Sequence, residues 1–189
     1  MTRVRLATPE DGEALAGIYR PAVADRATSF EIDPPDAAEM ARRVTSALER
    51  YPWLVCVNSE QVIGYAYASR HRERAAYQWA VEVSAYVGDG AHRTGVGRRL
   101  YESLFRVLAV QGYQRAFAGI TLPNEASVGF HTALGFTPVG VYHRIGWKFG
   151  AWHDVLWLER AIDDTLAPPD APPIPLAQLT TSAIAAALG

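Results

Sequence analysis

Between residues 77 and 108 the spacing of apolar side chains changes from that of a strand to that of a helix. In "YQWAVEVSAYV" (77–87), apolar side chains alternate with a second, more polar set, which is typical of a strand with two distinct faces. From Gly95 onward the apolar residues follow helical spacing, at Val96, Leu100, Leu104 and Leu108. A strand that feeds a glycine-rich turn and then a helix can present free backbone N–H groups to a phosphate. This stretch therefore predicts both a mixed α/β fold and a possible anion site.

The rest of the chain surrounds this stretch with short strand and helix patterns. Strands are expected over 4–7, 53–57, 62–69, 115–120, 137–142 and 151–160, and helices over 8–24, 36–48 and 124–134. The order β-α-α-β-β-β-α-β-α-β-β predicts an α/β (mixed α+β) fold, with a largely antiparallel central sheet flanked by helices.

A change of composition near residue 162 divides the chain. Residues 1–162 are predicted to form the folded domain, and residues 163–189 a Pro/Ala-rich C-terminal tail. The run "APPDAPPIP" (167–175) is too rich in proline for a helix or strand interior and should lie extended at the surface. The last residues could form a terminal helix or stay frayed. A tail without a catalytic role is the simpler interpretation, and a dimer-bracing arm is the alternative.

Charge and cysteine content exclude several classes of partner. The formal net charge of −2 gives no overall attraction for nucleic acid or an anionic membrane, so any anion site must be local. No apolar run approaches the roughly 20 residues of a membrane span, and the N-terminus lacks the apolar core of a signal peptide. The single cysteine, Cys56, is expected to be a small core residue. We therefore expect a cytoplasmic protein without a disulfide that binds neither nucleic acid nor membrane.

The glycine loop, "AHRTGVGRRLY" (91–101), does not match the two best-known phosphate-binding sequences. The P-loop requires a Gly-Lys pair, which the chain lacks. The dinucleotide-binding sequence requires a third glycine or alanine where Leu100 stands, as well as a βαβ unit. By itself the loop could be a helix start that tolerates glycine. Several arginines beside the positive end of a helix dipole favour an anion site.

The combination of motifs resembles the GCN5-related N-acetyltransferases. In that family an acid-bearing strand precedes [Q/R]-x-x-G-x-[G/A] at a helix start, and N-x-x-[A/S] begins a later helix that ends in G-F. The stretches "AYQWAVEVSAYV", "TLPNEASVGFHTALGF" and "GWKFGAWHDVLWLER" are similar to a narrower group, the phosphinothricin and methionine sulfoximine/sulfone N-acetyltransferases. The resemblance covers roughly residues 2–160. It implies acetyl-CoA as cosubstrate, a small amino acid as acceptor and a homodimer.

The resemblance also assigns residues to the cosubstrate. The glycine loop would hold the pyrophosphate of acetyl-CoA, and the strand before it would pair with the pantetheine arm and donate backbone N–H groups to the thioester oxygen. His92 stands where the family usually has Gln or Arg. The expected cofactor-binding residues are Ala85, Tyr86, Val87, His92, Arg93, Thr94, Gly95, Val96, Gly97, Arg98, Asn124 and Ser127.

Two residues are the candidate catalytic groups. Glu82 interrupts the apolar run of a central strand, where a carboxylate is costly unless it faces a polar cleft, so it is the candidate general base. The alternative is an exposed or ion-paired strand residue. His131 shares a helix face with Asn124 and Ser127, and many family members have a tyrosine at its position. It could protonate the leaving thiolate, act as a second base, or be structural.

The acceptor site is predicted from the same resemblance. A substrate carboxylate favours a bidentate guanidinium, and "SRHRERAAYQW" offers three arginines, of which Arg74 matches the narrower group best. The expected substrate-binding residues are Phe30, Glu31, Arg74, Tyr77 and Glu82.

No histidine spacing indicates a metal site, so none is expected. With no Cys or Ser placed as a nucleophile, direct acetyl transfer to an α-amino group is expected. A non-catalytic acyl-CoA sensor is the alternative, as is transfer to another small amine or a peptide N-terminus.

Overall fold

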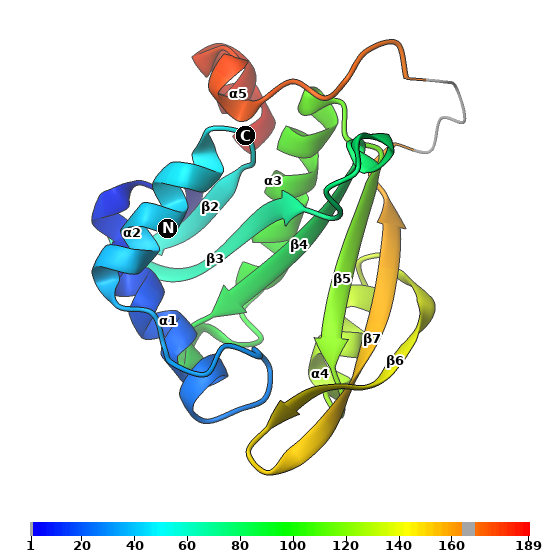
Figure 1. Cartoon of the computed structure of the whole chain (residues 1–189). Helices are drawn as coiled ribbons and strands as arrows, with labels where there is room; N and C mark the ends of the chain where they lie inside the picture. The colour runs from blue at the N-terminus through cyan, green and yellow to red at the C-terminus, as the bar shows by residue number, and fades with distance from the viewer. Residues whose placement is uncertain (1, 164–168) are drawn as a thin grey trace.

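The computed structural model describes residues 2–163 and 169–189. In them, seven strands form one sheet in the order β1-β2-β3-β4-β5-β7-β6, with helices on both faces (Figure 1). The strands are β1 Thr2–Leu6, β2 Trp53–Asn58, β3 Gln61–Arg70, β4 Ala80–Val87, β5 Arg115–Thr121, β6 Thr137–Lys148 and β7 Ala151–Ala161. The helices are α1 Gly12–Ala24, α2 Ala37–Leu48, α3 Val96–Gln111, α4 Glu125–Thr132 and α5 Thr181–Leu188. The predicted order and the largely antiparallel sheet are confirmed.

Several element boundaries differ from the sequence-based expectations. The strand expected from residue 77 begins at Ala80, because residues 75–77 form a short 3-10 turn. A similar turn at Pro9–Asp11 precedes α1. The helix expected over 124–134 ends at Thr132, and its predicted cap is present: the Asn124 side chain accepts a hydrogen bond from the Ser127 N–H at 3.1 Å. Strand β6 continues to Lys148, six residues beyond the expected end.

The sheet separates two apolar layers. On one face α3 packs over the central strands, and Cys56 is buried there together with Leu100 and Leu104. On the other face α1 and α2 cover the β2–β3 side, with Val44 and Tyr65 fully buried between them. The alternation of side chains along each strand sends neighbours to opposite layers. The expectation that Cys56 is a core residue is confirmed.

Strands β4 and β5 are paired only at their beginnings. Their parallel register runs from Ala80 opposite Arg115 to Glu82 opposite Phe117 and then ends. Beyond this point β4 stays hydrogen-bonded to β3 and β5 to β7, so each strand follows its other neighbour. Figure 1 shows the two strands side by side at their starts and apart at their arrowheads. The separation leaves backbone N–H and C=O groups of both strands available to a ligand.

The described part of the tail packs against α3. Leu176 and Ala187 are buried against Val107. Arg106 donates from Nε to the Ala187 carbonyl at 2.7 Å, near the end of α5, where a positive charge favours the helix dipole. Of the two alternatives for the last residues, the structure has the terminal helix. In residues 2–163 and 169–189, no helix is long and apolar enough to cross a membrane.

Candidate active site

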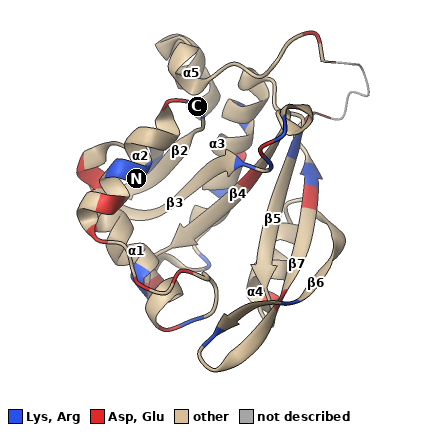
Figure 2. Cartoon of the chain, in the orientation of Figure 1, with Lys and Arg blue, Asp and Glu red and all other residues tan. Residues whose placement is uncertain are grey.

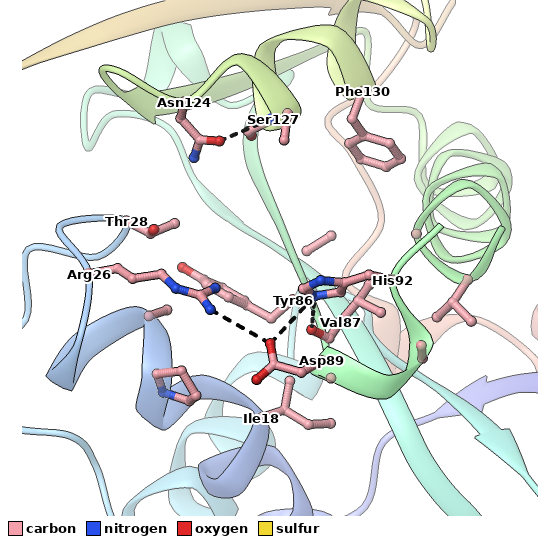
Figure 3. Close-up of a pocket in the computed structure, with 18 of the residues that line it drawn as sticks. Ile18, Arg26, Thr28, Tyr86, Val87, Asp89, His92, Asn124, Ser127 and Phe130 are labelled. Carbon is pink, nitrogen blue, oxygen red and sulfur yellow. Dashed lines mark hydrogen bonds and ion pairs between the residues drawn. The ribbon is translucent and has the colours of Figure 1, made fainter. Parts of the chain in front are cut away.

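A cleft of about 1150 Å³ opens between α1, the end of β4, the glycine loop and the start of α4. It brings together eleven of the twelve predicted cofactor-binding residues: Ala85, Tyr86, Val87, His92, Arg93, Gly95, Val96, Gly97, Arg98, Asn124 and Ser127. Thr94 lies outside this lining, and its hydroxyl donates to the Ala91 carbonyl at 2.6 Å within the loop. Figure 3 shows α4 on one side of the cleft and α1 with its following loop on the other.

The glycine loop leaves the N-terminus of α3 open toward this cleft. Gly95 has φ +85°, a left-handed conformation that other residues adopt only at a cost, and no side chain caps the helix. A Cβ atom on Gly97 would come within 3.1 Å of the Phe130 ring. The first N–H groups of α3 therefore face a space that an anion can enter closely.

One rim of the cleft carries an ionic and hydrogen-bonded cluster. His92 donates from Nε2 to the Val87 carbonyl at 2.8 Å, because a carbonyl oxygen can only accept. Asp89 lies 3.7 Å from the Arg26 guanidinium, which comes from the loop after α1 (Figure 3). Arg26 and Thr28 both line the cleft. The sequence analysis missed them, since no local motif distinguishes them from ordinary loop residues.

A narrow slot continues from the cleft between the separated parts of β4 and β5. Tyr101 and His131 both line it. The Nδ1 atom of His131 lies 2.8 Å from the Ser127 carbonyl, so Nδ1 carries the proton. In the neutral ring Nε2 then accepts a hydrogen bond from the Tyr101 hydroxyl, at 3.1 Å. Burial lowers the pKa of His131, which favours this neutral form.

Glu82 stands where the two strands separate, in register with Phe117. Its Oε1 atom lies 3.1 Å from His71 Nδ1 and 3.5 Å from a guanidinium nitrogen of Arg72. Burial raises the pKa of the Glu82 carboxyl above its ordinary value, while Arg72 opposes this rise. Glu82 itself lines neither the cleft nor the slot, whose lining from β4 begins at the next residue, Val83. A half-buried carboxylate with a raised pKa at this place has the properties of a general base. Figure 2 shows acidic and basic residues close together at the start of β4 and in the connection before it.

Arg72 is the arginine that the structure brings to Glu82. Its guanidinium lies 5.8 Å from the centre of the Trp157 ring and 3.4 Å from the Tyr142 hydroxyl. Arg74, the residue favoured by the sequence, is exposed at the start of the 3-10 turn. Tyr77 ends this turn, with its ring edge-on to His71 at 6.1 Å. Both predicted residues are therefore near Glu82 in the chain, but Arg72 makes the contact.

The other two predicted substrate residues lie in the loop between α1 and α2. Phe30 is partly exposed and its ring contacts Gly146 of β6. Glu31 accepts two hydrogen bonds from the Arg43 guanidinium, at 2.8 and 2.9 Å, and one from the Tyr19 hydroxyl at 2.9 Å. The adjacent Arg43 holds the pKa of Glu31 below its ordinary value. Glu31 thus fixes the shape of the loop that presents Phe30.

Lys148 anchors the same loop from the far end of β6. Its buried ammonium donates to the carbonyls of Val23 and Ser29, both at 2.7 Å. A cation there also complements the C-terminal end of the α1 dipole. The sequence analysis missed this residue, because nothing local to it indicates a partner 119 residues away. In the described part of the chain, no group of His, Cys, Asp and Glu side chains could hold a metal ion.

Comparisons with known proteins agree with this geometry. The model of the acetyltransferase (GNAT) domain matches residues 4–157. A phosphinothricin N-acetyltransferase of Streptomyces coelicolor is 38% identical over 164 residues, which are 85% of this chain and 96% of that protein. An L-methionine sulfoximine/L-methionine sulfone acetyltransferase of Pseudomonas aeruginosa is 32% identical over 168 residues, 88% of this chain and 98% of that protein. The structure of a GNAT superfamily phosphinothricin acetyltransferase from Sinorhizobium meliloti in complex with AcCoA has a TM-score of 0.86 at 32% identity, covering 93% and 96% of the two chains.

Proposed function

The chain belongs to the GNAT family and is an N-acetyltransferase, and we propose that it acetylates the α-amino group of a small amino acid such as phosphinothricin or methionine sulfoximine. Acetyl-CoA is the proposed acetyl donor. The observation that carries the proposal is the separation of β4 and β5: an open helix N-terminus lies at one end of the cleft, and Glu82 stands where the strands meet.

The residues around the cleft fit the chemistry of acetyl-CoA. The uncapped first turn of α3 offers N–H donors to a pyrophosphate, and Gly97 permits close approach. The unpaired edge of β4 around Ala85 to Val87 can bond the amide groups of a pantetheine arm in the manner of an added strand. Backbone N–H groups of the same edge would stabilise the developing negative charge on the thioester oxygen.

Glu82 is the proposed general base. An amino-acid ammonium must lose a proton before its nitrogen can attack, and the raised pKa of Glu82 matches it better to that task than an exposed carboxylate. Transfer would be direct, in a complex that holds both substrates. Cys56 is buried in the core. Ser127 has its hydroxyl 3.4 Å from His131 Nδ1, but this nitrogen already donates to a carbonyl and cannot activate it.

His131 is proposed to serve the leaving thiolate through Tyr101. The neutral imidazole accepts from the Tyr101 hydroxyl, and both side chains line the slot between the strands. When the thiolate leaves, the Tyr101 hydroxyl can turn from His131 Nε2 and transfer its proton to the sulfur, and the tyrosinate then regains a proton from solvent in the open cleft. The neutral His131 ring holds the hydroxyl and supplies no proton itself. Of the three alternatives considered for His131, this arrangement favours none directly: the ring would assist an acid, Tyr101, and would not itself protonate the thiolate or act as a second base.

The acceptor would be recognised by the groups around Glu82. Arg72 is the proposed partner of the α-carboxylate, with Arg74 as the second arginine of the same connection, and Tyr77 and Phe30 would form apolar walls. A phosphinate is anionic, and a sulfoximine or sulfone is neutral with partially negative oxygen atoms. The basic connection before β4 is therefore better suited to these groups than to a polycationic acceptor.

We also propose that the protein forms a homodimer through the β6–β7 hairpin. β6 is an edge strand, and five large apolar side chains of this hairpin are more than half exposed: Val139, Ile145, Trp147, Phe149 and Trp152. Such an edge and patch favour self-association. Sedimentation equilibrium giving the mass of one chain would contradict this.

The test of the function is thiol release from acetyl-CoA with a panel of free amino acids that includes phosphinothricin, methionine sulfoximine and methionine sulfone. We expect at least one of these to be acetylated on nitrogen, with product identified by mass. Glu82→Gln should lower kcat by about 10²- to 10⁴-fold. If acetyl-CoA binds but none of these amino acids releases thiol, the proposed class of acceptor is wrong.

A further inference from the structure

His71 is a partly buried histidine with no assigned role, and it contacts Glu82 directly. Its side chain is only 11% exposed, in the connection between β3 and β4. The ring lies parallel to Phe117, with the centroids 4.3 Å apart and 12° between the planes. Tyr77 and Trp157 approach it edge-on, each at 6.1 Å. Aromatic rings on three sides hold the imidazole in one orientation.

That orientation sends Nδ1 to the carboxylate. Nδ1 lies 3.1 Å from Glu82 Oε1. An ionised carboxylate can only accept a hydrogen bond, so Nδ1 carries the proton when Glu82 is ready to act as a base. Burial, with a smaller contribution from Arg72, lowers the pKa of His71, which favours the neutral ring. The imidazole is then a fixed neutral donor to the carboxylate.

The register of the sheet makes this contact specific. Phe117 is the last residue of β5 that pairs with β4, and its partner is Glu82. The side chain that stacks on Phe117 therefore also reaches the carboxylate where the strands separate. Few positions in the fold could meet both conditions. We propose that His71 is a positioning residue, which fixes the orientation of the Glu82 carboxylate toward the acceptor amine and stabilises its ionised form.

Other charged or titratable groups also face Glu82. Arg72 comes from the same connection as His71 and lies 3.5 Å from the carboxylate. Tyr67 of β3 interacts electrostatically with Glu82. Glu159 of β7 is in register with Phe117, the residue that is paired with Glu82, and lies on the same face of the sheet. Arg72 supplies charge from a long, partly exposed side chain, whereas His71 supplies a fixed hydrogen bond, so the two contributions can be separated by mutation.

This inference rests on the proposed role of Glu82 as the base, and the experiment separates the two. The kcat/KM for the acceptor is measured against pH for wild type, His71→Phe and His71→Asn. His71→Phe keeps an aromatic ring against Phe117 but removes the donor. We expect the acidic limb of the pH profile of His71→Phe to move to higher pH by about one unit. The ionised Glu82 carboxylate loses a hydrogen bond, so its pKa rises. His71→Asn keeps a donor near the Nδ1 position and should restore the limb at least partly.

The controls define what each outcome means. His143→Gln removes an exposed histidine that pairs with Asp154, away from Glu82, and should leave the limb in place. The affinity for acetyl-CoA, measured by calorimetry, should be the same for all variants if they fold. An unshifted limb in His71→Phe, or an equal shift in His71→Asn, overturns the inference. If Glu82→Gln keeps wild-type activity, the assignment of the base has failed, whatever the His71 variants do.

Discussion

At the glycine-loop end of the cleft the lining comes mainly from one short run of chain, residues 85–98, and much of it is backbone. The proposed acceptor site around Glu82, which we call the Glu82 end, is made instead of side chains from segments far apart in the sequence: the loop after α1, the connection before β4, and strands β5 and β7. A site made of consecutive backbone groups can be recognised in a sequence. A site assembled from distant side chains becomes visible only when the register of the sheet is known.

Among the substitutions that test the comparison of the two ends, Gly97→Val has the largest expected effect, and that effect is on the affinity for acetyl-CoA. Gly97→Val adds atoms where a Cβ alone would come within 3.1 Å of the Phe130 ring, so the approach to the α3 N-terminus closes. Losing one charge-assisted hydrogen bond costs about 1.5–3 kcal/mol, so the Kd of acetyl-CoA should rise about 10- to 100-fold. Calorimetry measures the Kd, and steady-state kinetics the KM for the amino acid, which should stay unchanged.

Gly129→Ala is the matched control for that substitution. Gly129 lies in α4, and a Cβ there meets nothing within 4 Å. Its affinity for acetyl-CoA should equal that of wild type, and its helix should be slightly stabilised. If Gly97→Val raised the KM for the amino acid as much as the Kd of acetyl-CoA, the two ends would not be independent.

The contrast between the ends also explains what the sequence could predict. The order of elements followed from local patterns, because periodicity and glycine positions are local properties. The family and the predicted cofactor-binding residues followed from a resemblance of short motifs, and eleven of those twelve residues line the cleft. The boundary of β4 was wrong by three residues, since an apolar run does not distinguish a 3-10 turn from a strand end. Arg72 was one of the three candidate arginines, but its contact with Glu82 could not be predicted, nor could the contacts of His71 and Lys148, since their partners come from other strands and helices. Residues 164–168, part of the predicted tail, lie outside the described residues.

The second prediction tests the Glu82 end through the loop that presents Phe30. Arg43→Gln removes both hydrogen bonds from the guanidinium to Glu31 and leaves that carboxylate only the one from Tyr19. It also removes the hydrogen bond from Arg43 Nε to Glu39, at 2.7 Å. Arg43 and Glu31 are each about one-third exposed, so the effect should be modest. We expect the KM for the amino acid to rise about 3- to 10-fold, with the Kd of acetyl-CoA unchanged. Arg42→Gln, which removes a neighbouring arginine that bonds only Glu39, is the control.

The same ion pair predicts a pH dependence of stability. Arg43 lowers the pKa of Glu31 from its ordinary value of 4.5, so the stabilisation is present above that value and is lost as the pH falls through the lowered pKa. The Tm of Arg43→Gln should therefore lie below that of wild type at pH 7, by a few degrees at most, and the difference should shrink as the pH falls through the lowered pKa of Glu31. A constant difference across this range would show that Glu31 is not the partner whose charge matters.

The smallest expected effect concerns Arg26, which belongs to the loop of the Glu82 end but lines the cleft at the glycine-loop end. Its guanidinium lies 3.7 Å from Asp89, and both side chains are more than half exposed. Arg26→Ala removes a positive charge and leaves Asp89 unneutralised beside the proposed phosphate site, and both changes disfavour an anion. Since exposed charges are strongly screened, the Kd of acetyl-CoA should rise only about two- to threefold at low salt, and the difference should vanish near 0.5 M salt. Arg20→Ala, at an exposed position of α1 outside the cleft lining, should leave the Kd of acetyl-CoA unchanged at both salt concentrations. If Arg26→Ala instead changed the KM for the amino acid and left the Kd of acetyl-CoA unchanged, Arg26 would act with the Glu82 end. Its role would then be determined by the loop to which it belongs and not by its position in the cleft.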